Sequence, residues 1–545
     1  MSTAPPAGSY HTDEDERTLH RLGYAQELFR AMGGFQNFAI SFTIISILAG
    51  CLTSYAIAYG QGGPVAITWG WLIVGLMSTL VALSMAEIAS AFPTAGGLYY
   101  WASKLGGPGW GWTTGWFNLI GQIAVTAAIG YGLAIFGQVL FDDWFTYTQH
   151  MNDWFGMSFN AATYTLYALF MIAAIVINML NIRLTSGLNM FSAWWHMIGV
   201  VLIVGILVVV PDHHQSVSYV FTETVNNSGY GGGTTSLSNP AFWFVFGLGL
   251  LLSQYTITGF DASAHTAEET NQASRMAATG MWTSVFVSVV FGFVLLVAVT
   301  FAIPGTTDQA LEQINNFVPV VPWIWTESMG VHWAEFLLFI CVVAQFFCVT
   351  ASLTSASRML FAFSRDGAVP GHQLWRRVAR NRVPRWSVLA IAFMAGVLMV
   401  PAIWNYFVGY AVGTAIAVIG LYIAFVIPVY LRWRKGDGWN EERAWSLRGH
   451  YKWIDPLSLI WVAIITVLFC FPLYNIGLPW NADFSWDFAN YTVLWFAGFG
   501  IVFGGWWALS AKNWFKGPVR MGTEEELEQL EQQQLGVFAL PPEAP

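Results

Sequence analysis

The chain carries no charged residue between Arg30 and Glu87. A helix needs about 20 apolar residues to cross a bilayer, so this stretch is too long for one crossing and long enough for two. The sequence GQGGP at residues 60–64 combines the two residue types that most often interrupt a helix. The stretch therefore predicts two membrane-spanning helices joined by a tight turn.

Composition extends this conclusion to the whole chain. Of its 545 residues, 56% are hydrophobic and only 10% are charged, whereas soluble domains carry about 25% charged residues. A chain of this length with so few charges cannot cover its own surface in water. The composition excludes a soluble multidomain protein and indicates a polytopic membrane protein whose surface contacts the lipid bilayer.

Apolar segments of sufficient length recur along the chain and predict an all-α fold. We expect twelve transmembrane helices, near residues 38–58, 65–86, 112–141, 161–181, 187–210, 241–263, 280–303, 333–360, 387–403, 407–431, 457–474 and 491–510. The segments 1–24 and 216–239 lack such apolar runs, and we expect the first to be disordered and the second to be a flexible loop.

Lysine and arginine predict the orientation of these helices. If the N-terminus is cytoplasmic, all 22 Lys and Arg residues fall in cytoplasmic segments or at the cytoplasmic end of the eighth span, and the outer segments carry only acidic charges. Positive charge of this kind marks the cytoplasmic side of a membrane protein. We therefore expect a multi-pass protein of the plasma membrane with cytoplasmic tails at residues 1–32 and 512–545.

Two of the expected spans are poor continuous helices. Gly50 lies among serine and threonine residues in the first span, and Gly259 lies between Thr258 and Phe260 in the sixth. Glycine weakens a helix, and hydroxyl side chains compete for its backbone hydrogen bonds, so both segments are expected to unwind. Unwound backbone at this depth is tolerated where it lines a cavity. The alternative is that each glycine only lets two helices pack closely.

An unwound segment offers free amides to a carboxylate and free carbonyls to a cation. The candidate substrate-binding residues are therefore Ser46, Ala49, Gly50, Cys51, Gln122, Thr258, Gly259, Phe260 and Asp261. Gln122 lies four residues after Asn118, so the two share a helix face; they serve either a ligand or hydrogen bonds between helices.

Asp261 is the one carboxylate beside an expected break. A charge at this depth costs about 2.5–3.5 kcal/mol unless it is paired or solvated. The first, third and fifth spans offer no Lys or Arg, so we expect a substrate ammonium group or a proton as its partner. The alternative is that Asp261 caps a helix and helps Glu268 and Glu269 to close the cytoplasmic side.

Three motifs carry a resemblance to a known family. Residues 86–101 (AEIASAFPTAGGLYYW), 268–271 (EETN), and 357–359 (SRM) with 365–370 (RDGAVP) resemble the loops after helices 2 and 6 and the end of helix 8 in amino acid–polyamine–organocation (APC) superfamily permeases. Residues 258–265 (TGFDASAH) look most like the amino acid/choline branch, which includes 4-aminobutyrate (GABA) permeases.

This resemblance implies a LeuT-like fold with two inverted five-helix repeats and broken helices 1 and 6. Helices 1–5 would occupy residues 33–210 and helices 6–10 residues 241–432, with an extracellular loop at 211–240. A cytoplasmic loop and helices 11–12 would follow at 433–511. The resemblance also implies a secondary active transporter, not an enzyme, that imports an amino acid or a related amine such as 4-aminobutyrate by alternating access.

The coupling ion is expected to be H⁺ or Na⁺, with no cofactor, no bound metal and no catalytic residue. Some proton-coupled relatives carry a lysine on helix 5, where this chain has only His196 as an ionisable residue. Histidine titrates near physiological pH, so we expect His196 to carry the proton; the alternative is a neutral histidine hydrogen-bonded to a neighbouring helix. If sodium binds instead, Thr350 and Ser352 would supply hydroxyl ligands, with carbonyls near Ala49 completing the shell.

Other functional classes fit less well. A membrane redox enzyme needs several histidines within its spans, and we place only His196 deep in one. A channel usually repeats a filter around a symmetric pore, and no such repeat is evident. A sodium-coupled or exchanger-type permease for choline or polyamine and a transporter-like sensor remain as alternatives. No nucleic-acid partner is expected, and the sequence leaves the oligomeric state open.

Overall fold

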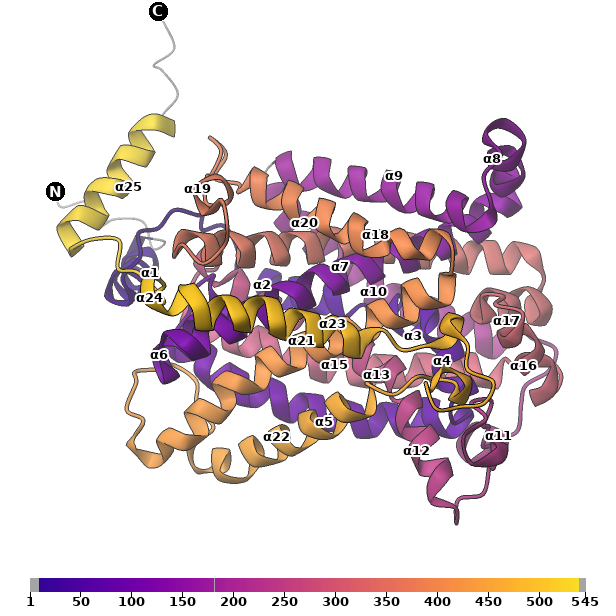
Figure 1. Cartoon of the computed structure of the whole chain (residues 1–545). Coiled ribbons are helices and arrows are strands. Elements are labelled where there is room, and N and C mark those ends of the chain that lie inside the picture. The colour runs from indigo at the N-terminus through magenta and orange to yellow at the C-terminus, as the bar shows by residue number, and fades with distance from the viewer. Residues whose placement is uncertain (1–8, 181, 539–545) are drawn as a thin grey trace, which may run out of the picture.

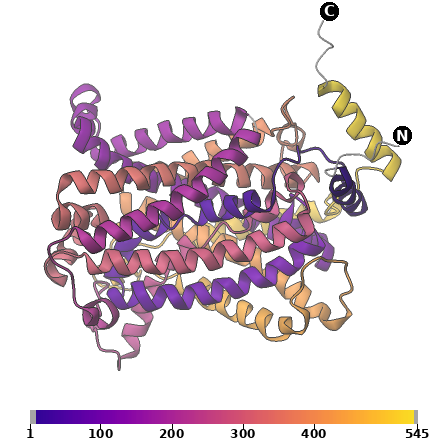
Figure 2. The same ribbon diagram turned by 180° about the vertical axis from the view of Figure 1, so that it is seen from behind.

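The computed structural model describes residues 9–180 and 182–538. Long helices run side by side through the molecule, as Figure 1 and the reverse view in Figure 2 show. Apart from an isolated bridge between Met32 and Thr270, regular structure in these residues is helical. The expected all-α fold is confirmed.

Eleven helices of the described chain are long and apolar enough to cross a membrane. They are formed by α2 (Gly34–Ile45) with α3 (Gly50–Thr53), α5 (Pro64–Ala91), α7 (Pro108–Phe145), α9 (Phe159–Leu180), α10 (Ile182–Val209), α15 (Ala273–Phe301), α18 (Val331–Arg365), α20 (Arg385–Met399) with η3 (Val400–Ile403), α21 (Tyr406–Lys435), α22 (Tyr451–Leu468) and the helix that begins with α23 (Thr492–Phe499).

The remaining expected span, residues 241–263, is not one helix. It consists of α12 (Pro240–Gly249), α13 (Leu251–Thr256) and α14 (Ala262–His265). The helix is interrupted between α13 and α14, where the sequence predicts a break, so the segment does not form a single helix.

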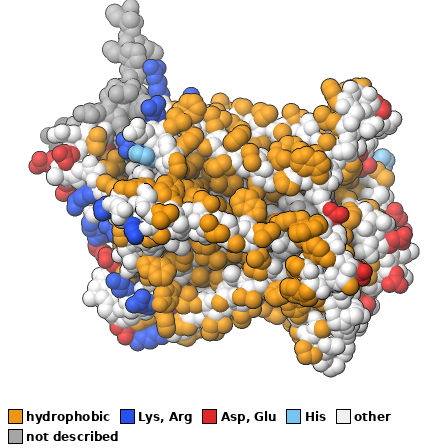
Figure 3. All heavy atoms as spheres, viewed as in Figure 1, with side chains coloured by type: hydrophobic (Ala, Val, Ile, Leu, Met, Phe, Trp, Pro, Cys, Tyr) orange, Lys and Arg blue, Asp and Glu red, His pale blue; other side chains and the backbone are white. Residues whose placement is uncertain are grey.

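The shorter helices gather at the two ends of the long ones (Figure 1). At one end lie α1 (Ser9–Leu22), α6 (Gly97–Gly106), α19 (His372–Trp375), α24 (Lys512–Trp514) and α25 (Glu524–Phe538); at the other lie α4 (Tyr55–Gly60), α8 (Tyr147–Phe155), α11 (Val217–Thr222), α16 (Thr307–Asn315) and α17 (Val320–Met329). On the face shown in Figure 3, hydrophobic side chains cover the middle, and Lys and Arg gather at the end that carries α1 and α25.

Two segments are more ordered than the sequence predicts. Residues 9–22 form α1, and the His20 ring lies 2.9 Å from the carboxylate of Glu531 on α25. In the expected loop 216–239, α11 forms, and the carbonyl of Ser228 accepts a hydrogen bond of 2.8 Å from the Asn475 amide. The expected disorder is therefore wrong for residues 9–22, whereas residues 1–8 lie outside the described residues. The segment 216–239 is largely a loop, as expected, and partners distant in sequence hold it in place.

Helix α7 occupies the centre of the structure and is almost entirely buried. It packs against α18 and α21. Gly121 of α7 and Gly420 of α21 face each other so closely that a Cβ atom on Gly420 would lie 3.1 Å from the Cα atom of Gly121. Small residues permit this approach between membrane helices, and α7 is thereby held beside the broken helices.

Candidate functional site

The first break separates α2 from α3. Helix α2 ends at Ile45, Ser46 has the left-handed φ of 34°, and α3 begins at Gly50. The amides of Ala49 and Gly50 both donate to the Ser46 carbonyl, at 2.8 and 3.0 Å. Within the described chain, the amides of Ile47 and Leu48 donate to no acceptor. The free amides thus lie two residues before Ala49 and Gly50, the candidates that the sequence predicts at this break.

The second break separates α13 from α14. Helix α13 ends at Thr256, and Gly259 takes a φ of +84°, which residues with a side chain rarely adopt. The amides of Thr258, Gly259 and Phe260 donate to no acceptor among the residues that the structure describes. Buried amides are nearly always paired, so three free ones in succession form a site for an acceptor such as a carboxylate.

The two breaks touch each other. A Cβ atom on Gly50 would lie 2.5 Å from Oγ1 of Thr256, and one on Gly259 would lie 2.1 Å from Cγ2 of Ile44. Both explanations of these glycines therefore hold at once: each lies at an interrupted helix, and each allows close packing against the other break.

A cavity of about 10 Å³ lies at this contact. Its lining includes Ala49 and Gly50 of the first break, Thr258 of the second, Ile129 of α7 and Gln345 of α18. A cavity needs roughly 10–15 Å³ to hold one water molecule, so the helices have closed around the site. The other candidates do not line this cavity: Ser46, Cys51, Gln122, Gly259, Phe260 and Asp261.

Gln345 is a site residue that the candidate set omits. Its Nε2 donates to the Leu48 carbonyl at 3.3 Å, and its buried Oε1 has no hydrogen-bond partner in the described part of the chain. An amide oxygen accepts hydrogen bonds, so this atom can receive one from a ligand. The sequence feature that could have identified Gln345 is a glutamine within an otherwise apolar span.

Asp261 already has protein partners. Its Oδ2 accepts hydrogen bonds from Nε2 of Gln122 at 2.7 Å and Nδ2 of Asn118 at 3.2 Å, and it lies 3.2 Å from Nε2 of His265. This carboxylate thus has protein partners in addition to the substrate ammonium group or proton that the sequence predicts. His265 is completely buried, so His196 is not the only histidine deep in the protein.

His196 is buried and makes a hydrogen bond at each ring nitrogen. Its Nδ1 lies 2.8 Å from the carbonyl of Ser192, and its Nε2 lies 2.8 Å from Oγ of Ser46. The carbonyl can only accept, so Nδ1 carries the proton and Nε2 is free to accept from the hydroxyl. A neutral ring satisfies this arrangement, and the ring positions the residue at which the first break begins.

The structure does not bring Thr350 and Ser352 together. The hydroxyl of Thr350 donates to the Phe346 carbonyl at 2.8 Å, whereas the hydroxyl of Ser352 pairs with that of Thr126 on α7 at 2.7 Å. Residues two apart on a helix point in different directions, and this pair contacts different neighbours.

Two buried ion pairs close the end that carries α1 and α25. Glu269 contacts Arg358 at 3.1 Å, and Glu268 contacts Arg365 at 2.9 Å. Burial raises the pKa of Glu269, while Arg358 opposes this shift. These contacts join the segment after α14 to α18.

The N-terminal segment covers these ion pairs. The ring of Tyr24 lies 3.8 Å from the Arg365 guanidinium, and its hydroxyl donates to Asp366 at 2.8 Å. Tyr99 and the Val519 amide also donate to this carboxylate. Burial raises the pKa of Asp366, and Arg365 lowers it.

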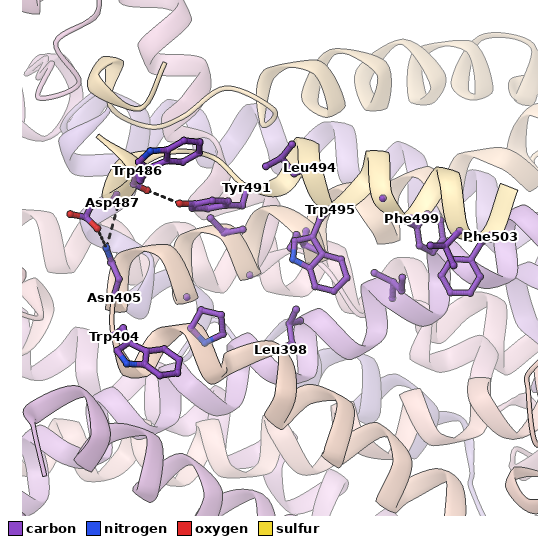
Figure 4. Close-up of a pocket in the computed structure, with 18 residues that line it drawn as sticks. Leu398, Trp404, Asn405, Trp486, Asp487, Tyr491, Leu494, Trp495, Phe499 and Phe503 are labelled. Atoms are coloured by element: carbon purple, nitrogen blue, oxygen red, sulfur yellow. Dashed lines mark hydrogen bonds between the residues drawn. The ribbon is translucent and has the colours of Figure 1, made fainter. Parts of the chain in front are cut away.

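A larger cavity lies elsewhere. It has a volume of about 770 Å³ and lies between η3, α21 and α23 (Figure 4). Leu398, Trp495 and Phe499 line its length, and Asn405 bonds to Asp487 at one end. It contains none of the candidate site residues, so we do not place the substrate there.

A helical membrane protein with two broken helices in contact belongs structurally with the transporters that bind small molecules at such breaks. A family model for amino acid permeases matches residues 32–502, and the chain belongs to this family of the APC superfamily, whose fold is the LeuT fold. It is thus an amino acid transporter and not an enzyme.

Curated relatives cover most of the chain. It is similar to amino-acid permease BAT1 of Arabidopsis thaliana (34% identical over 519 residues, 93% of this chain and 96% of that protein). The BAT1 homolog of Oryza sativa subsp. japonica is 35% identical over 519 residues, with the same coverage. The GABA-specific permease of Saccharomyces cerevisiae is 28% identical over 391 residues, which are 69% of this chain and 64% of that protein.

Proposed function

We propose that this chain imports an amino acid or a related amine, such as 4-aminobutyrate, across the plasma membrane by alternating access, driven by a proton gradient. The observation that carries the proposal is the contact between two helix breaks, each with free backbone amides, beside a small cavity lined by Ala49, Gly50 and Thr258. Backbone amides at helix ends favour anions, and every amino acid presents a carboxylate.

The two ends of the substrate would use different groups. The free amides of Ile47 and Leu48, with those of residues 258–260, bind the carboxylate. The unpartnered Oε1 of Gln345 accepts a hydrogen bond from the amine. Asp261 does not line the cavity, and we assign it no contact with the substrate.

Alternating access is supported by the difference between the two sides of the site. Toward α1 and α25, the Glu268–Arg365 and Glu269–Arg358 pairs close the path. Toward the other end, a second cavity of about 70 Å³ begins at Thr53, which also lines the central one. A substrate enters on that side, and the ion pairs must separate before it leaves on the other.

The named relatives support the substrate class, since two are called amino-acid permeases and one a GABA-specific permease. The separation of Thr350 from Ser352 favours a proton over sodium, because a sodium ion needs its oxygen ligands to converge.

Orientation follows from the charges at the α1 and α25 end, which favour the cytoplasmic side. A membrane-impermeant thiol reagent applied from outside should modify Ser238→Cys and spare Gln373→Cys in a cysteine-free background, since both positions are exposed at opposite ends. The reverse pattern would contradict the orientation.

Uptake into proteoliposomes tests the function. Full-length protein is reconstituted, and labelled alanine, 4-aminobutyrate, choline and putrescine are offered with an inward proton gradient, an inward sodium gradient or neither. We expect accumulation of an amino acid or 4-aminobutyrate with the proton gradient. Accumulation only with sodium would overturn the coupling, and binding without uptake would indicate a sensor.

A further inference from the structure

The strongest unassigned feature is the contact between Asp261 and His265. The two side chains are completely buried, and Oδ2 of Asp261 lies 3.2 Å from Nε2 of His265. They are one helical turn apart, directly after the second break. The second carboxylate oxygen, Oδ1, has no hydrogen-bond partner in the described part of the chain.

The hydrogen bond at Nδ1 of His265 decides whether Nε2 can carry a hydrogen in the neutral ring. Nδ1 of His265 lies 3.0 Å from the carbonyl oxygen of Ala95, which can only accept a hydrogen bond. Nδ1 therefore carries a hydrogen, and in a neutral imidazole the second nitrogen then carries only a lone pair. An ionised Asp261 would face that lone pair with another acceptor. Nε2 of His265 makes no hydrogen bond in the described part of the chain. Two buried acceptors in contact are unfavourable, and one additional proton on either group removes the conflict.

We propose that Asp261 and His265 together bind one exchangeable proton, and that this proton drives transport. Bound, it forms either an imidazolium–carboxylate pair or a neutral acid beside Nε2, so the proton belongs to the pair and not to one residue. In both forms the pair is neutral overall. Loss of the proton leaves one negative charge, which the amides of Asn118 and Gln122 partly stabilise.

No positively charged side chain of the described residues pairs with Asp261 in place of the proton. Among the described residues, no Lys or Arg nitrogen lies within 4.0 Å of Asp261. Four charged residues of the neighbouring α18 and η2 (Ala267–Glu269) pair with each other: Arg358 with Glu269, and Arg365 with Glu268.

The uncharged neighbours also have other partners. Tyr99 of α6 donates to Asp366, Tyr100 of α6 donates to the Leu22 carbonyl, and Tyr422 of α21 donates to the Ile257 carbonyl. From α2, Asn37 bonds to the Ser263 carbonyl at 3.0 Å. From α15, Arg275 is exposed.

The pair also connects the substrate site to the inner ion pairs. Phe260, with its free amide, directly precedes Asp261. Ala95 accepts from His265 through its carbonyl and donates through its amide to Glu268 at 3.0 Å. Glu268 in turn pairs with Arg365. Opening of the inner side breaks this chain of contacts, admits water to the pair and releases the proton.

This inference rests on the proposed proton-driven transport, so the test begins with a measurement that needs no substrate. Full-length protein with ¹⁵N-labelled histidine is titrated in lipid nanodiscs from about pH 9 to about pH 5. The His265 signals are assigned by their loss in His265→Gln. We expect Nδ1 protonated throughout and a proton at or hydrogen-bonded to Nε2 at the acidic end. A neutral ring with a bare Nε2 at the acidic end would overturn the proposal even if uptake is observed.

The second measurement compares two modes of transport with labelled 4-aminobutyrate and alanine. Asp261→Asn keeps a donor beside Nε2 but has no dissociable proton, and His265→Gln keeps a donor beside Oδ2. Each should lower proton-driven accumulation by about tenfold or more while exchange at equal pH stays within about threefold of the unmodified protein. Retained proton-driven accumulation in both variants would overturn the proposal.

Asp455→Asn is the matched control. Asp455 is a carboxylate of α22, 1% exposed, that accepts a hydrogen bond from Ser84 at 2.7 Å and has no histidine partner among the described residues. It should keep its response to the proton gradient. Loss of that response in Asp455→Asn, with retention in Asp261→Asn, would assign the proton to Asp455 instead. Absence of any uptake by the unmodified protein would contradict the proposed function, and the histidine titration would then decide the proton site alone.

Discussion

Gly50 lies against Thr256 with no room for a side chain between them: a Cβ atom on Gly50 would be 2.5 Å from Oγ1 and 2.9 Å from Cα of Thr256. Because one of these atoms is backbone, the added methyl cannot be accommodated by rotating a side chain. The contact fixes the distance between the two breaks and therefore the shape of the central cavity.

Gly50→Ala should therefore separate the breaks. Overpacking of this kind costs about 1–3 kcal/mol, and we expect a lower unfolding temperature together with at least about tenfold slower uptake. Gly205→Ala is the control, since nothing lies within 4 Å of its added methyl. Equal uptake by the two variants would show that the close contact does not shape the site.

Gly97, the first residue of α6, should be required to leave room for the His265 ring. Its φ is +46°, and a Cβ atom there would lie 3.1 Å from Cε1 of His265. In Gly97→Ala, the left-handed backbone costs about 1–2 kcal/mol, and the methyl group displaces the ring. Gly367→Ala has the same backbone cost at a φ of +81° but meets no atom within 4 Å. We expect only the first variant to change the pH dependence of uptake; an equal change in both would assign the effect to strain.

The Arg358–Glu269 pair should stabilise the closed inner side only while both partners are present. Arg358→Met leaves a buried carboxylate alone, and breaking such a pair costs about 3–5 kcal/mol. Arg358→Met with Glu269→Gln should recover most of the unfolding temperature.

The stability loss of Arg358→Met should also depend on pH. Burial raises the pKa of Glu269, and removal of the arginine raises it further. A carboxyl group whose folded-state pKa is raised favours the folded protein below its unfolded pKa and loses that contribution as the pH rises through the folded value. The deficit in unfolding temperature should thus grow between about pH 5 and about pH 8. A deficit that is constant over this range would contradict this assignment.

His196→Gln should slow transport without removing its pH dependence. The ring of His196 accepts from Ser46 and holds the start of the first break, so the variant should lower the maximal uptake rate several-fold. If the proton resides on His265 and Asp261, the response to the proton gradient should persist. Its loss in His196→Gln would return the coupling proton to His196, as the sequence suggests.

Much of the architecture was predictable from the sequence because it depends on local composition. Runs of apolar residues exceed the bilayer thickness, and the lysines and arginines lie outside them or, like Arg358, at the end of one. The interruptions at Gly50 and Gly259 were predictable for the same reason, since glycine and hydroxyl residues weaken a helix wherever they occur. His265 could have been found as well, because a residue four positions after Asp261 lies on the same helix face.

The partners at the site were decided only by the tertiary structure. Asn118 and Gln122 reach Asp261 from α7, Gln345 reaches the first break from α18, and Ala95 fixes the protonated nitrogen of His265. The sequence shows that these polar groups are buried in apolar helices, but not which of them meet. A buried polar group takes whichever partner the packing of distant helices brings within about 3 Å, so this pairing is a property of the assembled fold.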